Sequence, residues 1–271
     1  MKPSPFQILP ALQWRKGAAG AKAVERAVPE ETAIGVSYDS EPYAVLMATP
    51  TDLEDLALGF TVTERIAAAA DVIEVRIGEH PEGLVADVLL SREGSQTSRQ
   101  RRRRNMEGRS SCGLCGVQEL DDAIRAMPPL PDGFAVRREA IQAALAALET
   151  EQTLSRATRA VHAAAWADAE GRLLLVREDV GRHNALDKLI GAALRAGHDP
   201  AKAFVVVTSR CSYEMVEKTA IAGVSLLAAI SAPTALAIRR AEAANMSLIA
   251  LARADGHAVF TGAERVLETT D

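Results

Sequence analysis

The chain of 271 residues has few aromatic residues and no long apolar run free of charge. Aromatic residues make up only 4% of it, which argues against the base-stacking platforms that bind single-stranded nucleic acid. A net charge of −5 also argues against a general nucleic-acid binder. Because no apolar run could span a bilayer, we expect no membrane segment. Met1–Pro10 has no apolar stretch of signal-peptide length, so we expect a cytoplasmic protein.

Cysteine is also scarce, and three cysteines are too few for a disulfide framework. Two of them lie three positions apart, in Ser111-Cys112-Gly113-Leu114-Cys115-Gly116. Six arginines and one glutamate lie between Arg99 and Arg109, just before this pair. Nearby positive charge favours thiolate, the form that attacks sulfur, carbon or a metal. We therefore interpret the pair as exposed, reactive cysteines rather than core residues.

The remaining pattern predicts an α/β protein with three parts. We expect a loose N-terminal arm at 1–30, an α+β domain at 31–130 with a mobile Cys-x-x-Cys loop at 91–116, and an α/β domain at 131–271. Thr51-Asp52-Leu53-Glu54 predicts a capping box that begins a helix extending to Ile66. In the last domain, predicted strands alternate with helices of about 10–15 residues, which implies parallel pairing. Its strands are expected at 161–167, 172–177, 203–208, 225–230, 247–251 and 257–260, and its helices at 182–196, 212–222 and 231–245.

Three loops that follow predicted strands are candidates for ligand binding, because ligands of open α/β sheets bind beyond the carboxyl ends of strands. The first loop carries Arg182 and His183, the second Ser209 and Arg210, and the third Arg253. Free backbone N–H groups and arginines suit phosphate, so an anionic, nucleotide-like ligand is expected. The residues alone leave a second interpretation equally open, in which these loops are merely solvated.

Several long motifs resemble the FdhD family, which are sulfur carriers that assist the maturation of formate dehydrogenase. The motifs are Ser111–Gly116, Glu178–Lys188 and Ser209–Val216, with shorter ones at Met47–Pro50, Asp52–Phe60 and His162–Trp166. The resemblance covers residues from about 40 to 265. It implies an α/β fold with a three-layer, cytidine-deaminase-like C-terminal domain and a smaller α+β N-terminal domain.

The resemblance also implies a mechanism. A cysteine desulfurase would supply persulfide sulfur to Cys112, and Cys115 would assist its transfer to the molybdenum or tungsten bis-pterin guanine dinucleotide cofactor of the formate dehydrogenase catalytic subunit. GDP would then be a surrogate ligand, and no metal site of the protein's own is expected. The implied cofactor contacts are Leu251, Ala252, Arg253, Ala254, Asp255 and Gly256, joined by Arg182, His183, Ser209 and Arg210. Alanine-rich apolar helices favour a homodimer.

Other interpretations of the cysteine pair have less support from the sequence. His80-Pro81-Glu82 followed by Cys-x-x-Cys resembles the zinc deaminase signature, but Ser111 replaces its proline and His80 lies in a turn. A structural zinc site would need a second cysteine pair, and a thioredoxin-like disulfide would need a small βαβ unit. A non-catalytic chaperone of the cofactor or the dehydrogenase stays open. Cys211 is expected to be a small buried residue.

Overall fold

The computed structural model describes residues 4–17, 19–105, 127, 129–132, 134–253 and 255–268. Its helices are α1 (Leu53–Thr63), α2 (Arg92–Asn105), α4 (Arg138–Glu151), α5 (Thr153–Thr158), α6 (Arg182–Ala196), α7 (Tyr213–Ile221) and α8 (Ala235–Ala243). Short 3-10 helices cover Ala69–Asp71, Pro200–Lys202 and Ala263–Arg265. None of the helices in these ranges is both long and apolar enough to cross a bilayer.

The strands form two main sheets and two strand pairs. The N-terminal strands are β1 (Phe6–Gln13), β2 (Lys22–Pro29), β3 (Thr32–Tyr38), β4 (Glu41–Ala48), β5 (Val72–His80) and β6 (Gly83–Leu90). The C-terminal strands are β7 (Val136–Arg137), β8 (His162–Asp168), β9 (Leu173–Asp179), β10 (Ala203–Val207), β11 (Leu226–Ala229), β12 (Ser247–Arg253), β13 (Gly256–Thr261) and β14 (Val266–Leu267). The pairs β1–β2 and β7–β14 stand outside the two main sheets.

A six-stranded sheet in the order β13-β12-β11-β10-β8-β9 organises the C-terminal half. β10, β11 and β12 pair in parallel, as the alternation of strands and helices predicted. β8 and β9 instead form an antiparallel hairpin, and β13 pairs antiparallel with β12. The prediction of parallel pairing is therefore correct only for the centre of the sheet, because short turns rather than helices join the outer strands.

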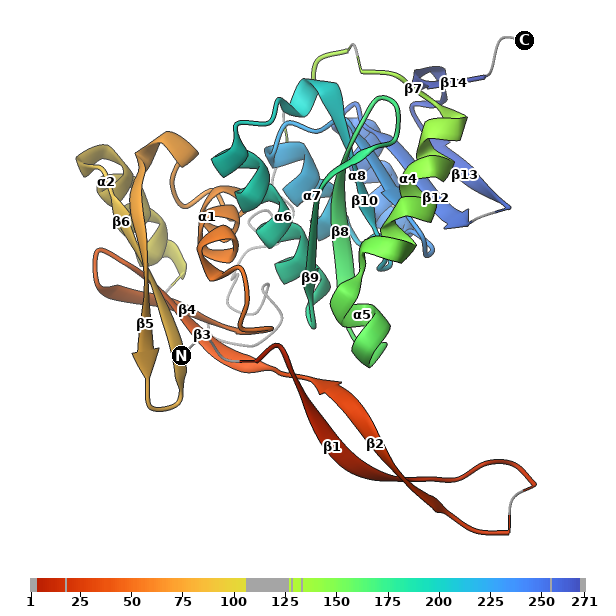
Figure 1. The fold of residues 1–271 in the computed structure, drawn as a ribbon. Coiled ribbons are helices and arrows are strands. Elements are labelled where there is room, and N and C mark those ends of the chain that lie inside the picture. Colours follow the sequence, from red (N-terminus) through yellow and green to blue (C-terminus); the bar gives the residue numbers. More distant parts are fainter. Residues whose placement is uncertain are drawn as a thin grey trace.

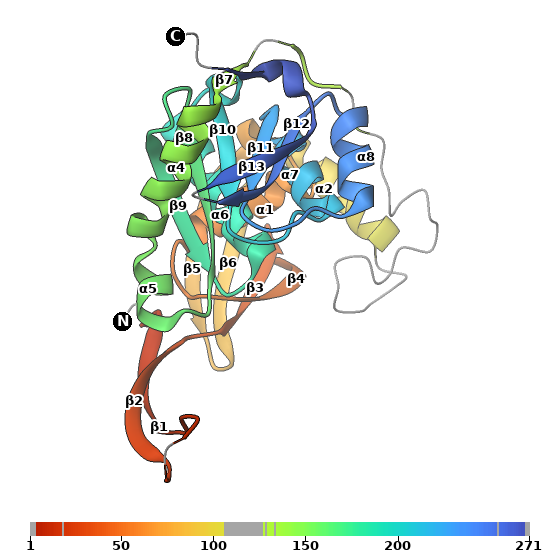
Figure 2. The same ribbon diagram turned by 90° about the vertical axis from the view of Figure 1, so that its right-hand side faces the viewer.

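Helices cover both faces of this sheet, which gives three layers and the predicted α/β class (Figures 1 and 2). β10 is buried along its whole length, so both of its faces are apolar. Val205 and Val207 pack in the core formed with α6, α7 and α8, while Phe204 and Val206 pack in the core formed with α4. Burial on both faces explains why a short, uninterrupted apolar run specifies a central strand.

A smaller sheet in the order β4-β3-β6-β5 lies in the N-terminal half. One face packs on α1 through residues such as Ile34, Val36 and Val88. α1 in turn crosses α6 at two glycines, since a Cβ on Gly59 would lie 1.8 Å from the carbonyl oxygen of Asp187. This close crossing joins the two halves of the molecule.

Four sequence predictions about the N-terminal half were wrong. The segment at 1–30 contains the paired strands β1 and β2 rather than a loose arm. The predicted mobile loop at 91–116 contains α2, which ends at Asn105; residues 106–116 lie outside the described ranges. α1 lacks the predicted capping box, because Asp52 has a left-handed φ of 52° and its side chain makes no capping hydrogen bond. That helix ends at Thr63 rather than Ile66.

Candidate functional site

Three strands that precede the candidate loops run in the same direction. β9 and β10 each pair antiparallel with β8, and β10, β11 and β12 are mutually parallel. The carboxyl ends of β9, β10 and β12 therefore lie along one edge of the six-stranded sheet, which we call the carboxyl edge. His162, at the amino end of β8, lies at the same edge because it pairs with Asp179.

The predicted contact residues differ in their accessibility along this edge. The first turn of α6 contains Arg182 and His183, and the loop after β10 contains Ser209 and Arg210. The end of β12 contains Leu251, Ala252 and Arg253, and the turn into β13 contains Asp255 and Gly256. Ser209 and Ala252 are buried, whereas Arg210, Leu251, Arg253 and Asp255 are exposed. Cys112, Cys115 and Ala254 lie outside the described residues.

The buried carboxylate of Asp179 holds the loop after β9 in place. Its Oδ1 accepts hydrogen bonds from the backbone N–H of Gly181 at 2.8 Å and from Asn184 Nδ2 at 3.1 Å. Its Oδ2 accepts one from the N–H of Thr49 at 3.0 Å and lies 2.6 Å from Nζ of Lys188, which is fully buried. Four donors on one carboxylate fix the loop that begins α6.

A cluster of titratable groups follows at the start of α6. Nε2 of His183 lies 3.0 Å from Oε2 of Glu214 on α7. Burial alone would raise the pKa of Glu214. The hydrogen bond and charge of His183 and the charge of Arg182 have the larger effect, so the pKa of Glu214 lies below its usual value. Burial lowers the pKa of His162, and the nearby charges of Arg182 and His183 lower it further. The positive charge at the start of α6 therefore favours the binding of a negatively charged group there.

Two buried polar atoms in this region lack a hydrogen-bond partner among the described residues. They are Nε of Arg182 and Oγ of Ser212, the latter just before α7. Buried polar atoms are usually satisfied, and exceptions often mark an absent ligand or water. The guanidinium suits phosphate and the hydroxyl can donate to it.

The loops after β10 and β11 are joined by Cys211. Its N–H donates to the carbonyl of Ala232 at 3.3 Å, and its carbonyl accepts from the N–H of Thr234 at 3.0 Å. Cys211 is fully buried, and burial raises the pKa of its thiol to about 12. This confirms the expectation of a small buried residue, and a thiol so disfavoured as thiolate is a poor nucleophile.

The third predicted loop is only partly directed toward the other two. Leu251 has a left-handed φ of 52° at an irregular point of β12, and its N–H donates to the carbonyl of Ser231 in the loop after β11. Asp255 and Gly256 instead line a separate cavity of about 500 Å³ with residues of α4 and β13. The structure therefore brings Leu251 toward the first two loops but places the turn into β13 beside α4.

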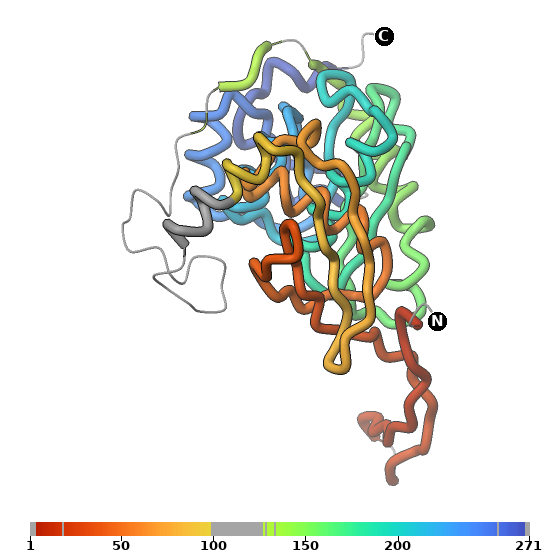
Figure 3. Tube along the Cα trace, turned by 90° about the vertical axis from the view of Figure 1, so that its left-hand side faces the viewer, coloured from red at the N-terminus to blue at the C-terminus, as the bar shows by residue number. Residues whose placement is uncertain are grey.

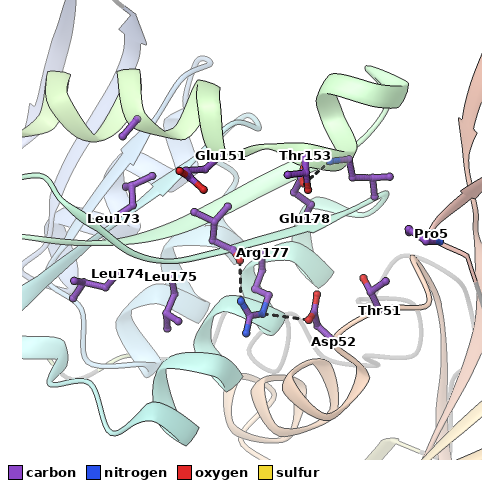
Figure 4. Close-up of a pocket in the computed structure, with 13 residues that line it drawn as sticks. Pro5, Thr51, Asp52, Glu151, Thr153, Leu173, Leu174, Leu175, Arg177 and Glu178 are labelled. Carbon is purple, nitrogen blue, oxygen red and sulfur yellow. Dashed lines mark hydrogen bonds and ion pairs between the residues drawn. The ribbon is translucent and has the colours of Figure 1, made fainter. Parts of the chain in front are cut away.

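A second cavity, of about 690 Å³, lies along β9 rather than at the carboxyl edge (Figure 4). Two of its charged groups, Glu178 and Arg177, are held by structural contacts. Glu178 accepts hydrogen bonds from the N–H groups of Leu154 and Ser155 at 2.8 Å each, which caps α5. Arg177 donates to Asp55 at 2.7 Å and 2.9 Å. Neither of these two groups is therefore a free nucleophile or base.

A buried ionic network between α1, α6 and α7 was not predicted from the sequence. Lys218 Nζ donates to Asp187 at 3.0 Å, to Thr63 Oγ1 at 2.9 Å and to Glu64 at 2.7 Å. Burial opposes the charged form of Lys218, but Asp187 and Glu64 outweigh it and hold its pKa above the usual value. The sequence does show that Asp187 and Lys188 are charged residues within a largely apolar stretch of α6, which indicates that charged groups are buried there.

The zinc deaminase alternative gains no support from the described residues. They contain no group of three or more His, Cys, Asp or Glu side chains arranged to hold a metal ion. His80 ends β5 in the tight turn to β6, and its Nδ1 accepts a hydrogen bond from the N–H of Glu82 at 3.2 Å. A hairpin turn lacks the helix start that presents the histidine in that signature.

Comparison with known proteins decides the family. The model of the FdhD/NarQ family matches residues 29–267. The chain belongs to the FdhD/NarQ family. Curated family members named sulfur carrier protein FdhD include one from Bordetella petrii, 46% identical over 94% of this chain and 92% of its own length. Others are from Xanthomonas euvesicatoria, 45% identical over 97% and 93%, and Cupriavidus necator, 44% identical over 94% and 88%.

A solved structure supports the fold of this FdhD/NarQ family member. The crystal structure described as a formate dehydrogenase accessory protein from Desulfotalea psychrophila matches with a TM-score of 0.76. The match covers 97% of this chain and 100% of the other, at 24% sequence identity. At that identity the likeness establishes the shared fold.

Proposed function

We propose that this chain is a sulfur carrier that assists the maturation of a formate dehydrogenase. The observation that carries the proposal is the continuous family match over residues 29–267, together with relatives named as sulfur carriers at 44–46% identity. The matched range includes the arginine-rich segment and the Cys-x-x-Cys pair at Cys112 and Cys115. Cys211 is unsuited to the same role, because its thiol is buried.

The first step is thiol exchange with a cysteine desulfurase. The Cys112 thiolate attacks the outer sulfur of the desulfurase persulfide, a new S–S bond forms, and the desulfurase cysteine leaves as a thiolate. No electrons are gained or lost overall. The arginines before Cys112 favour its thiolate form and attract an acidic partner surface.

The second step delivers the sulfur to the cofactor. The Cys115 thiolate attacks Sγ of the Cys112 persulfide, the bond to the outer sulfur breaks, and hydrosulfide leaves toward the cofactor. Cys112 and Cys115 are then a disulfide, and a cellular dithiol supplies the two electrons that restore both thiols. The chain acts as a sulfurtransferase of this carrier type.

The sulfur acceptor is the molybdenum or tungsten bis-pterin guanine dinucleotide cofactor, bound as substrate. Its nucleotide ends would lie at the carboxyl edge, with GDP as a smaller surrogate. Support comes from the unpartnered Nε of Arg182 and Oγ of Ser212 and from the exposed guanidinium of Arg210 on the neighbouring loop. Of the remaining predicted contacts, Leu251 is the best placed, whereas Asp255 and Gly256 line the cavity beside α4.

The proposed partners are a cysteine desulfurase and the catalytic subunit of formate dehydrogenase. The chain would bind both of them in the cytoplasm. Self-association as a homodimer also remains a proposal. The alanine-rich helices are not its basis, because alanines of α4 and α6, such as Ala140, Ala144, Ala192 and Ala193, are buried in the chain's own core.

Maturation of formate dehydrogenase by variant chains tests the proposal. In cells lacking the endogenous carrier, Cys112→Ala should leave the dehydrogenase inactive while the wild type restores its activity. Cys211→Ala is the matched control and should restore activity, since that thiol is buried away from exchange. If Cys112→Ala restores full activity, the chain acts as a non-catalytic chaperone and the sulfur-carrier proposal is wrong.

A further inference from the structure

β9 is the outermost strand at one edge of the six-stranded sheet, and no described strand pairs with its outer side. Its first four residues, Leu173 to Val176, are all apolar. Leu174 is 43% exposed and lies beside a bulge in the pairing of β8 with β9. An exposed apolar edge strand is a ready template for pairing with another chain. This edge of the sheet is therefore a candidate interaction surface.

The pairing with β8 determines which backbone groups of β9 point outward. Ala163 of β8 is bonded on the side of β10, since its N–H donates to Thr208 Oγ1 at 2.9 Å and its carbonyl accepts from the N–H of Thr208 at 3.0 Å. Its partner on β9, Glu178, therefore points its backbone groups away from β8, as does Val176 two residues earlier. Nη1 of Arg177 covers the outward carbonyl of Val176, at 2.9 Å. The N–H groups of Val176 and Glu178 have no strand beyond them in the described sheet.

The cavity of about 690 Å³ lies along this edge, and we call it the β9 groove (Figure 4). Residues 173–178 line it, with the end of α4 and the start of α5 on one side and Thr51 and Asp52 on the other. Pro5, at the base of the β1–β2 hairpin, also lines it, and that hairpin lies beside α5 (Figure 3). Six extended residues span about 20 Å at about 3.3 Å per residue. The β9 groove thus suits a short extended segment that adds a strand to the sheet edge.

The charges of the β9 groove select the chemistry of that segment. Its lining carries three carboxylates, Asp52, Glu151 and Glu178, against one cation, Arg177. The charge of Arg177 is already engaged, because its guanidinium donates to Asp55 at 2.7 Å and 2.9 Å. Glu151 is exposed and has no ionic partner among the described residues. The excess negative charge favours a segment that carries lysine or arginine, and the apolar edge favours apolar residues beside them.

We infer that an extended, apolar and basic segment of the client formate dehydrogenase binds in the β9 groove as an added strand. The identity of this partner rests on the proposed function. β9 ends at Asp179, whose carboxylate holds the start of α6, where the candidate nucleotide-binding groups lie. A segment in the β9 groove is therefore held next to the carboxyl edge. The protein that gains from this position is the recipient of the cofactor, the dehydrogenase, rather than the desulfurase.

Binding of the full-length chain to the cofactor-free catalytic subunit of formate dehydrogenase tests the charge of the groove. Glu151→Lys and Leu174→Lys should each raise the dissociation constant at least about tenfold, because each places a cation against the basic segment. Glu149→Lys, at an exposed site of α4 outside the cavity, and Leu267→Lys, at a site 45% exposed on β14, are the matched controls and should leave it unchanged. Circular dichroism checks that each variant is folded.

Hydrogen exchange resolved to single amides tests the added strand itself. In the complex with the dehydrogenase subunit, the outward amides of Val176 and Glu178 should exchange at least about tenfold more slowly than in the free chain. The amides of Leu175 and Arg177 should change little, because alternation along β9 directs them toward β8. The desulfurase, added in place of the dehydrogenase, should leave all four amides unchanged.

The outcomes separate this interface from the sulfur-carrier function. Unchanged affinity in both test variants, controls as damaging as the test variants, no binding by the wild type, or protection of β9 by the desulfurase instead would each overturn the inference. A chain that takes up sulfur on Cys112 while β9 stays unprotected in the complex would overturn the inference and leave the carrier function standing. Protection of β9 in a chain that takes up no sulfur would do the reverse.

Discussion

At the residue scale, the two arginines predicted to bind phosphate, Arg182 and Arg210, both lie at the carboxyl edge. Arg182 begins α6 with its Nε buried and unpartnered among the described residues, and Arg210 is exposed on the next loop. Their location could be predicted from the sequence, because both lie in polar loops that follow apolar strands, and their binding role stays a prediction. The supporting residues Asp179 and Lys188 could not, since nothing in the sequence reveals which charges a fold will bury together.

The affinity for GDP should depend on these arginines. By calorimetry, Arg182→Ala and Arg210→Ala should each lower it roughly ten- to hundred-fold, since a charge-assisted hydrogen bond contributes about 1.5–3 kcal/mol. Arg172→Ala is the matched control, because Arg172 lies in the β8–β9 turn at the opposite edge of the sheet. Unchanged affinity in both test variants, or ADP binding as tightly as GDP, would contradict a guanine-nucleotide site here.

Lys188 should be among the residues most sensitive to substitution. Lys188→Met would leave the fully buried Asp179 carboxylate without its cation and should lower the free energy of unfolding by about 3–5 kcal/mol. Urea denaturation measures this, with Lys202→Met as the control, because Lys202 is 82% exposed and pairs with the half-exposed Asp199. An equal effect of the two substitutions would show that the buried pair does not hold the loop.

His162 should make stability depend on pH. Its pKa is lowered in the folded state by burial and by nearby positive charge, so the unfolded chain binds the proton more readily. Stability should therefore fall as pH drops from about 7.5 through the unfolded pKa of about 6.5, and His162→Gln should reduce that fall. Urea denaturation at several pH values tests this, and an undiminished slope in His162→Gln would refute the assignment.

At the element scale, the sequence predicted the C-terminal strands and helices far better than the N-terminal ones. β10 and β11 are uninterrupted apolar runs, and α6 ends at Gly197 in a left-handed conformation. The local sequence of each of these elements therefore predicts its type or its end. α2 does not, because its sequence is polar throughout. Its first turn is instead held by tertiary contacts, including Ser91 Oγ to Asp71 and Ser95 Oγ to Asp39, each at 2.6 Å. Pattern alone cannot reveal such contacts.

The crossing of α1 and α6 should tolerate no added methyl group. A Cβ on Gly59 would overlap the backbone of Asp187, and backbone cannot move aside cheaply. Gly59→Ala should therefore lower the free energy of unfolding by at least about 1–3 kcal/mol. Thermal or urea unfolding measures this against Gly78→Ala, since a Cβ on Gly78 would meet nothing within 4 Å. A difference near zero between the two variants would mean that the helices do not cross this closely.

At the scale of the whole molecule, hydrogen bonds made by buried ionic groups join the two halves. Asp179 and Lys188 bond to the segment around Thr49, and Asp187 and Lys218 bond to the end of α1. The N-terminal half thus positions the start of α6, where the candidate phosphate-binding groups lie. The sequence predicted two halves but not this connection, because its members are separated by more than a hundred residues and follow no local pattern.

The central claim is that sulfur is carried on Cys112, and mass spectrometry tests it most directly. The full-length chain is incubated with a cysteine desulfurase and cysteine and then digested under non-reducing conditions. The account predicts one added sulfur atom on the peptide containing Cys112, lost in Cys112→Ala and retained in Cys211→Ala. No added sulfur on the wild type, or sulfur confined to the peptide containing Cys211, would contradict the account.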